Sequence, residues 1–278
     1  MKILTFFADG KVRRGIIEGE YVIDEEGKGR SYKLSGVKIL PPVQPTAIFC
    51  TLTNSYKMVG ASSKEEAREM LRSPKFFLKL PTIVIGYGET IIAPRSGIRP
   101  EVEIGIVIGK KVKNITKDKV KDVIIGYTVF NDVTAPGEFK KDWYYAFRRD
   151  PNDGVIKKVL NRGIHFRNKN RDTFAPMGPY LVTPEEVNLD RARMKSYYDG
   201  ELVQDGTTEE FIFDIEEIIS ELSKIVTIPE MSVVTTGTVG YINAEEVTEF
   251  KLPAKSTEMV VEVEGLGRLI NAVSPEEG

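Results

Sequence analysis

The sequence is nearly devoid of two residue types that carry much of protein chemistry. Its 278 residues include one histidine, His165, and one cysteine, Cys50. A single cysteine excludes intramolecular disulfides and cysteine-rich zinc sites, and Cys50 in its apolar segment is expected to be inert core. A single histidine excludes zinc sites of the H-E-x-x-H type. A metal bound by this chain is therefore expected to have oxygen ligands, which favours Mg²⁺, Mn²⁺ or Ca²⁺.

An excess of charge and long apolar runs are also missing. The 39 basic and 41 acidic side chains give a formal charge of −2, so composition provides no bias toward nucleic acid or an anionic membrane. The start, MKILTFFADG, has too short an apolar stretch for a secretory signal, and no run approaches the roughly 20 residues that span a bilayer. We therefore expect a cytoplasmic protein without a membrane partner. Glutamine occurs only at Gln44 and Gln204, and with 29% charged residues this is typical of a thermophile.

Short segments of β-type sequence dominate what is present. Two helices are expected, one capped by Ser63 and ending near Leu71, the other over 215–225 with Asp214 as its cap. This pattern indicates a mostly β fold with a few helices, in the α+β class. The expected strands cover residues 2–7, 12–18, 47–52, 76–79, 83–85, 90–93, 102–108, 123–130, 193–198, 201–205, 233–236 and 258–262.

A cluster of prolines divides the chain. Pro41, Pro42 and Pro45 read as a stiff linker. We therefore expect a small N-terminal β unit over residues 1–40 and a main domain over residues 41–278.

Three carboxylates are candidates for a metal site. Glu101 and Glu103 alternate with apolar residues, so they share one face of a strand about 7 Å apart. Taken alone, this pattern favours a solvated outer face of a sheet. Asp132 follows a buried strand, where a carboxylate is costly unless it is paired, binds metal or caps the next loop. Together the three would form an oxygen site with open positions for water or substrate.

Six segments in a fixed order resemble the fumarylacetoacetate hydrolase family. The resemblance covers nearly the whole chain, from about Ile39 to Val273, and the unit before Pro41 is similar to the family's N-terminal appendage. The segments are KFFLKLPTIVIGYGETIIAP (75–94), PEVEIGIVIGK (100–110), GYTVFNDVTA (126–135), NKNRDTFAPMGP (168–179), DGELVQDGTT (199–208) and VVTTGTVG (233–240).

This resemblance implies a fold, a metal and a set of site residues. The fold would be a β-sandwich roll, commonly found as a homodimer or larger homo-oligomer. Mg²⁺ or Mn²⁺ would be bound by Glu101, Glu103 and Asp132, with Lys169 beside the metal as a catalytic residue. Substrate-binding positions would be Lys79, Thr238 and Gly237, with Gln204 as a further candidate. Apart from the resemblance, Lys169 could be a surface lysine, Thr238 and Gly237 only a turn, and Gln204 only a hairpin residue.

The chain departs from the family's hydrolytic members at one motif. Those members carry G-x-N-Y-x-x-H with a glutamate shortly after, whereas CTLTNSYKMVGA (50–61) places Met58 at the histidine position. Hydrolysis by a histidine-activated water is therefore disfavoured. Tyr56 and Lys57 lie in the same segment, and Tyr56 is our candidate for a replacement catalytic proton donor.

The resemblance is accordingly to the branch of 2-hydroxyhepta-2,4-diene-1,7-dioate isomerase and decarboxylases. It implies a metal-dependent isomerase or decarboxylase of a small anionic 2-oxo or 2-hydroxy-dienoic acid, acting through a metal-stabilised enolate. The alternatives are a 2-keto-3-deoxy sugar-acid dehydratase, an acylpyruvate or fumarylacetoacetate-type hydrolase, and a non-catalytic metal or ligand binder.

The spacer over residues 137–168 is longer than is usual in the family. It contains eight basic and four acidic residues, a local charge of +4, together with several aromatic residues. Nucleic-acid binding is disfavoured because no known motif accompanies this charge. A solvated surface and a mobile lid over an anionic substrate both remain open. His165, which lies in this spacer, is expected on the lid or surface, within reach of the site on closure.

Overall fold

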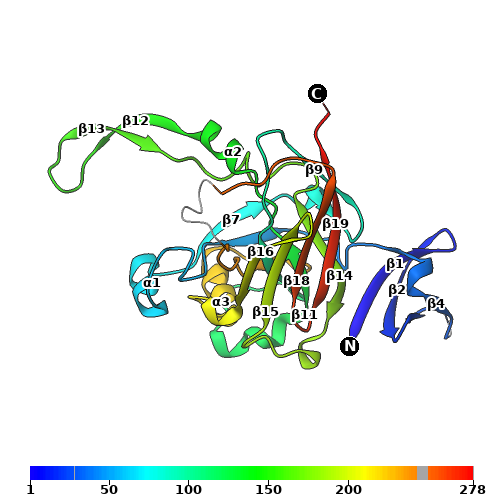
Figure 1. Ribbon diagram of the computed structural model, residues 1–278. Helices are drawn as coiled ribbons and strands as arrows, with labels where there is room; N and C mark the ends of the chain where they lie inside the picture. The colour runs from blue at the N-terminus through cyan, green and yellow to red at the C-terminus, as the bar shows by residue number, and fades with distance from the viewer. Residues whose placement is uncertain (28, 243–249, 278) are drawn as a thin grey trace.

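Two packed β-sheets form the body of the molecule in the computed structural model, which describes residues 1–27, 29–242 and 250–277 (Figure 1). The larger sheet has the strand order β4-β3-β2-β1-β14-β11-β10-β17-β6-β7, with β5 paired to β1 and β8 to β14. Its strands are β1 (Lys2–Ala8), β2 (Lys11–Glu18), β3 (Tyr21–Asp24), β4 (Ser31–Lys33), β5 (Lys38–Ile39), β6 (Ile48–Leu52), β7 (Lys75–Lys79), β8 (Val84–Ile85), β10 (Val102–Ile108), β11 (Ile124–Asn131), β14 (Ala175–Val182) and β17 (Val233–Thr235).

The second sheet has the order β16-β15-β18-β19-β9 and packs against the first through β18 and β19. It consists of β9 (Thr90–Ala93), β15 (Arg193–Tyr198), β16 (Glu201–Thr207), β18 (Thr257–Val263) and β19 (Gly267–Pro275). The described α-helices are α1 (Lys64–Leu71), α2 (Pro136–Phe139) and α3 (Ile215–Ile225). Short 3₁₀ helices cover Leu34–Gly36, Pro81–Ile83, Lys117–Val123, Lys140–Asp142, Pro184–Glu186 and Thr208–Glu210. Within the described residues, no helix combines the length and apolarity needed to cross a membrane.

Strand β10 lies at the centre of the core and is buried along its whole length. Its even-numbered side chains, such as Ile104 and Ile106, join an apolar cluster that includes Ile218 and Leu222 of α3. Val107, on the opposite face, belongs to a second cluster. The face that carries Glu101 and Glu103 is therefore buried, and the solvated outer face is ruled out.

The N-terminal segment forms a meander with its own apolar cluster of Leu4, Phe6 and Val22. It is nevertheless continuous with the main sheet, because β1 pairs with β14 at Lys2–Val182 and Ile3–Leu181. The division at the proline cluster stays a prediction. The main domain predicted over 41–278 also includes residues 243–249 and 278, which lie outside the described residues.

A two-stranded arm projects from the body (Figure 1). Among the described residues, strands β12 (Tyr144–Arg149) and β13 (Ile156–Asn161) pair only with each other, and they belong to the basic spacer. The arm begins after α2 and returns to the body at residues 162–169, just before β14.

The predicted helices are confirmed with their caps. Ser63 accepts a hydrogen bond from the Glu66 amide, and Asp214 accepts one from the Glu217 amide, as short polar N-caps do. The mostly β class is confirmed as well. The strands that the sequence pattern missed are β3, β4, β5, β12, β13, β14 and β19. Strand β14 escaped because two prolines and a glycine interrupt its apolar sequence, APMGPYLV.

Candidate active site

The three candidate carboxylates converge at the junction of β10 and β11. The antiparallel register places Val102 opposite Asn131, so Glu101 precedes one strand where Asp132 follows the other. The Asp132 amide donates to the Glu101 carbonyl at 2.9 Å and locks this end of the ladder. Carboxylate oxygens of Glu101, Glu103 and Asp132 lie within 4.8 Å of one another. The strand pairing thus builds an acidic cluster, with side chains at most 6% exposed.

Lysine and arginine side chains neutralise two of these carboxylates. Lys169 Nζ lies 2.7 Å from Glu101 Oε2 and 2.5 Å from Asp132 Oδ2. Arg99 contacts the other oxygen of Glu101 at 2.9 Å. Burial alone would raise the pKa of Glu101, but attraction to Lys169 and Arg99 outweighs it and lowers the pKa to about 2. Burial would lower the pKa of Lys169, yet the carboxylates raise it above its ordinary value, so Lys169 remains an ammonium.

Glu103 differs from its two neighbours because no described residue forms an ion pair with it. Its side chain is about 1% exposed and accepts a hydrogen bond from the Gly237 amide at 3.2 Å. Burial, followed by repulsion from Asp132, raises the pKa of Glu103 well above its ordinary value. A buried carboxylate without a cationic partner is costly, and a divalent cation bound among the three would relieve this cost. The donor set consists only of oxygens and fits Mg²⁺ or Mn²⁺.

Gly237 is required for that contact. Its φ is +79°, and a Cβ atom there would lie 2.9 Å from Cβ of Asn54 and 3.1 Å from the Thr51 carbonyl. Only glycine lets the turn after β17 come close enough to hold Glu103.

A cavity of about 320 Å³ opens over the carboxylates. Phe77, Met58 and Thr51 form walls contributed by the body of the protein. The hydroxyl of Thr51 is buried and has no hydrogen-bond partner among the described residues. The other wall comes from the base of the arm and includes Phe139, Arg162, Gly163, His165 and Asn168.

His165 is part of this wall, so it lines the cavity already and does not depend on closure of a lid to reach it. Its ring stacks on Phe139 at 4.4 Å between centroids, with an interplanar angle of 13°. Burial, aided by the nearby charge of Lys169, lowers the pKa of His165 to about 4. The imidazole is therefore neutral near pH 7.

Two predicted substrate-binding residues lie behind the cavity instead of facing it. Lys79 is about 1% exposed; its ammonium donates to the carbonyls of Val133 and Phe174 and pairs with Asp132 at 2.7 Å. Lys79 does not line the cavity, so its place is to hold Asp132 and not to contact the substrate.

Gln204 is fully buried and also has a positioning role. Its Nε2 donates to Thr238 Oγ1 and to the Val239 carbonyl, and its Oε1 accepts from the Val102 amide and the Ser196 hydroxyl. Both of its donors are occupied. Thr238 does line the cavity, although its hydroxyl already donates to the Val102 carbonyl at 2.8 Å.

The structure does not bring Tyr56 to the acidic cavity. Tyr56 and Lys57 line a separate surface hollow, where Lys57 pairs with Glu210 at 2.8 Å. Met58 is the member of this segment that faces the carboxylates. The catalytic role predicted for Tyr56 therefore finds no support in the geometry. Arg99 and Thr51 were missed, although Arg99 could have been found, since it alternates with Glu101 and Glu103.

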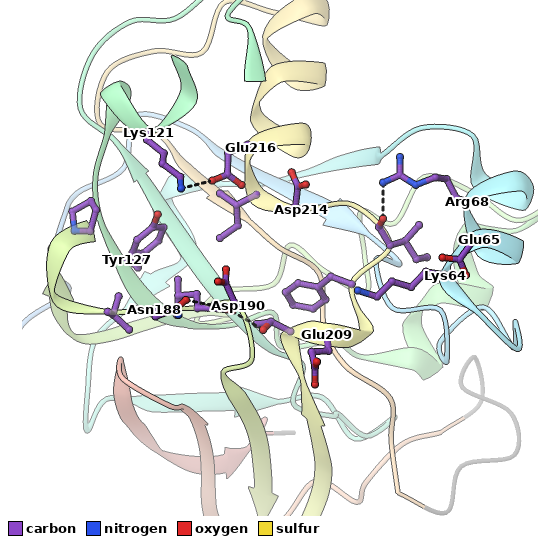
Figure 2. Close-up of a pocket in the computed structure, with 17 residues that line it drawn as sticks. Lys64, Glu65, Arg68, Lys121, Tyr127, Asn188, Asp190, Glu209, Asp214 and Glu216 are labelled. Carbon is purple, nitrogen blue, oxygen red and sulfur yellow. Dashed lines mark hydrogen bonds and ion pairs between the residues drawn. The ribbon is translucent and has the colours of Figure 1, made fainter. Parts of the chain in front are cut away.

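A larger hollow of about 740 Å³ lies between α1, α3 and the segment that joins β14 to β15 (Figure 2). Some of its charged residues contact each other or the backbone: Lys121 pairs with Glu216 at 3.5 Å, and Arg68 donates to the Ile212 carbonyl at 3.0 Å. Among the described residues, the only group of three potential metal ligands is the triad of Glu101, Glu103 and Asp132. The smaller cavity is therefore the candidate active site.

Comparison with known proteins points to one family. The model for the fumarylacetoacetate (FAA) hydrolase C-terminal domain matches residues 47–274. The human mitochondrial oxaloacetate tautomerase FAHD2A is 31% identical over 247 residues, which cover 86% of this chain and 70% of that protein. An uncharacterized protein of Methanocaldococcus jannaschii, MJ1656, is 32% identical over 274 residues, which cover 92% of this chain and 100% of that protein.

The fold is shared with a solved structure described as 2-hydroxyhepta-2,4-diene-1,7-dioate isomerase from Mycobacterium marinum. The two chains cover each other completely, with a TM-score of 0.76 and 24% identity. At this identity the likeness supports the fold alone.

Proposed function

The chain belongs to the fumarylacetoacetate hydrolase family, and we propose that it is a divalent-metal-dependent isomerase or decarboxylase of small 2-oxo or 2-hydroxy-dienoic (di)carboxylic acids. The observation that carries this proposal is the state of the three carboxylates. Glu101 and Asp132 form ion pairs with lysine and arginine side chains, whereas Glu103 forms none with any described residue. Glu103 is thus the one carboxylate of the three without an ion-pair partner among the described residues, and it lines a cavity that suits a small ligand.

Glu101, Glu103 and Asp132 would hold the metal. A bound Mg²⁺ or Mn²⁺ supplies Lewis-acid polarisation of the ligand's 2-oxo group. Lys169 contributes a fixed ammonium beside the position where enolate charge develops. Because its pKa is raised, Lys169 stabilises negative charge and does not act as a base.

A dicarboxylic substrate is favoured by the charge at the mouth of the cavity. Arg162 lines the cavity from the arm, is exposed, and holds its guanidinium 5.5 Å from the centroid of the Trp143 ring. Guanidinium groups bind carboxylates through paired hydrogen bonds, so Arg162 would bind the distal carboxylate. The human relative's name, oxaloacetate tautomerase, specifies a substrate with two carboxylates.

The proposal is tested by assaying oxaloacetate with metal-stripped protein and after addition of Mg²⁺ or Mn²⁺. We expect metal-dependent loss of the enol's ultraviolet absorbance, and pyruvate formation would report decarboxylation. The variants Glu101→Gln and Asp132→Asn should remain folded, lose metal binding and lose turnover. No metal-stimulated turnover of oxaloacetate or of a 2-hydroxy-dienoate, with metal bound, would favour a non-catalytic binder.

A further inference from the structure

An isomerase needs a group that takes up and returns a proton, and few residues around this cavity are able to do so. Glu101 and Asp132 are tied to cationic side chains, and Lys169 stays protonated. Glu103 is assigned to the metal in our proposal. A threonine hydroxyl such as that of Thr51 is too weak a base near neutral pH. The neutral imidazole of His165 is the remaining candidate.

The hydrogen bonding of His165 leaves one ring nitrogen available. Nδ1 lies 3.3 Å from Nδ2 of Asn168, whereas Nε2 makes no hydrogen bond to any described part of the chain. Asn168 is about 3% exposed, and its Oδ1 has no partner in its present orientation. The amide nitrogen donates to an unprotonated Nδ1, and after a flip Oδ1 accepts from a protonated Nδ1. Asn168 therefore supports both tautomers, so Nε2 is able to present either a proton or a lone pair.

We propose that His165, delivered from the base of the arm, is the proton-transfer residue of this cavity. This inference rests on the proposed function. Nε2 takes a proton from C3 of the 2-oxo acid; the C–H electron pair forms the C2–C3 double bond, and the carbonyl electron pair moves to oxygen. The imidazolium then gives a proton to the enolate oxygen, which yields the enol and restores the neutral ring. Isomerisation therefore requires no further reactant.

The charges that face His165 suit such a cycle. Lys169 and Arg99 disfavour the imidazolium, while Glu101 and Asp132 favour it. An anionic ligand adds negative charge to the cavity, which raises the basicity of the ring when substrate is bound. The imidazole of His165 is thus a stronger base when the substrate is bound than when the cavity is empty.

The test uses deuterium exchange at C3 of pyruvate in D₂O, followed by proton NMR with the Mg²⁺-loaded protein. His165→Asn should slow exchange by about 100-fold or more at unchanged pyruvate affinity, because general acid–base groups typically contribute 10²- to 10⁴-fold. Asparagine tolerates the left-handed backbone of His165, whose φ is +57°. Ile164→Asn, at the neighbouring residue whose side chain is 80% exposed, is the matched control and should exchange at the wild-type rate.

The outcomes separate the two proposals. Exchange by wild type and His165→Asn at equal rates would overturn the role of His165 and leave the proposed function standing. No exchange by loaded wild type on pyruvate, with no isomerisation of oxaloacetate, would overturn both.

A second readout does not depend on activity. Because the chain has one histidine, imidazole NMR signals of labelled protein belong to His165. We expect the imidazole to titrate near pH 4 in the metal-free protein. In the Mg²⁺-loaded protein, we expect it to titrate at a higher pH with oxalate than without oxalate. Titration near 6.5, unmoved by oxalate, would contradict a place in the cavity.

Discussion

The acidic cavity and the arm differ in where they hold their charged side chains: the cavity buries them, and the arm exposes them to solvent. In the cavity, Glu101, Asp132, Lys79 and Lys169 are nearly fully buried and each has a partner within 2.7 Å. On the arm, Lys157 pairs with Asp150 and Asp153 in contact with solvent. Buried pairs are held rigidly because breaking one leaves a charge without water, whereas exposed pairs contribute little. Chemistry is therefore expected in the cavity and recognition on the arm.

The largest effect should follow from breaking the buried network at its least accessible member. Lys79→Met removes the cation behind Asp132 and preserves most of the side chain's volume. We expect a loss of about 3–5 kcal/mol in the free energy of unfolding, measured by urea denaturation, because the buried Asp132 keeps only one of its two cationic partners, Lys169. A loss below about 1 kcal/mol would show that Lys79 is not needed to hold Asp132.

A smaller effect is expected where the two regions meet, at Arg162. Arg162→Gln should raise KM for oxaloacetate about tenfold, equivalent to about 1.4 kcal/mol, since a charged hydrogen bond to the distal carboxylate is lost. Deuterium exchange of pyruvate, which lacks that carboxylate, should be unchanged. Equal effects on both substrates would assign Arg162 to the structure of the arm instead of to specificity.

The smallest effect should follow from the matching change on the arm. Lys157→Met disrupts two exposed ion pairs and should leave the unfolding midpoint in urea unchanged. A clear destabilisation would mean that the arm's ion pairs are organised more tightly than their exposure indicates.

The sequence predicts the features that local rules determine, and it misses those that depend on long-range packing. Strand alternation predicts that Glu101 and Glu103 share a face, and the end of a buried strand marks Asp132, because these are local rules. Depth is not local. Lys79 and Gln204 have residue types suited to binding an anion, yet long-range packing places them behind the cavity, where their polar groups contact other parts of the protein.

The arm was missed although Pro151, Asn152, Asp153 and Gly154 form an ordinary turn signal between its two strands; no local rule specifies that the chain then returns to the cavity. His165 lies 33 residues after Asp132 in the sequence but reaches the same cavity, since β12 and β13 leave the body and return to it. Tyr56 was chosen from its place in a motif, and a motif position does not determine the direction of a side chain. Met58, two residues on, faces the carboxylates instead.

The most direct test of the central claim is a calorimetric titration with Mn²⁺ of wild type and Glu103→Gln, repeated at several pH values in two buffers. Glu103, with its raised pKa, holds a proton at low pH that the metal must displace, so wild-type affinity should rise with pH and proton release should grow as pH falls. In Glu103→Gln, binding should weaken at least about tenfold, as loss of a charged ligand implies, and the linked proton release should vanish. Equal affinity and equal proton release in both proteins would contradict the account.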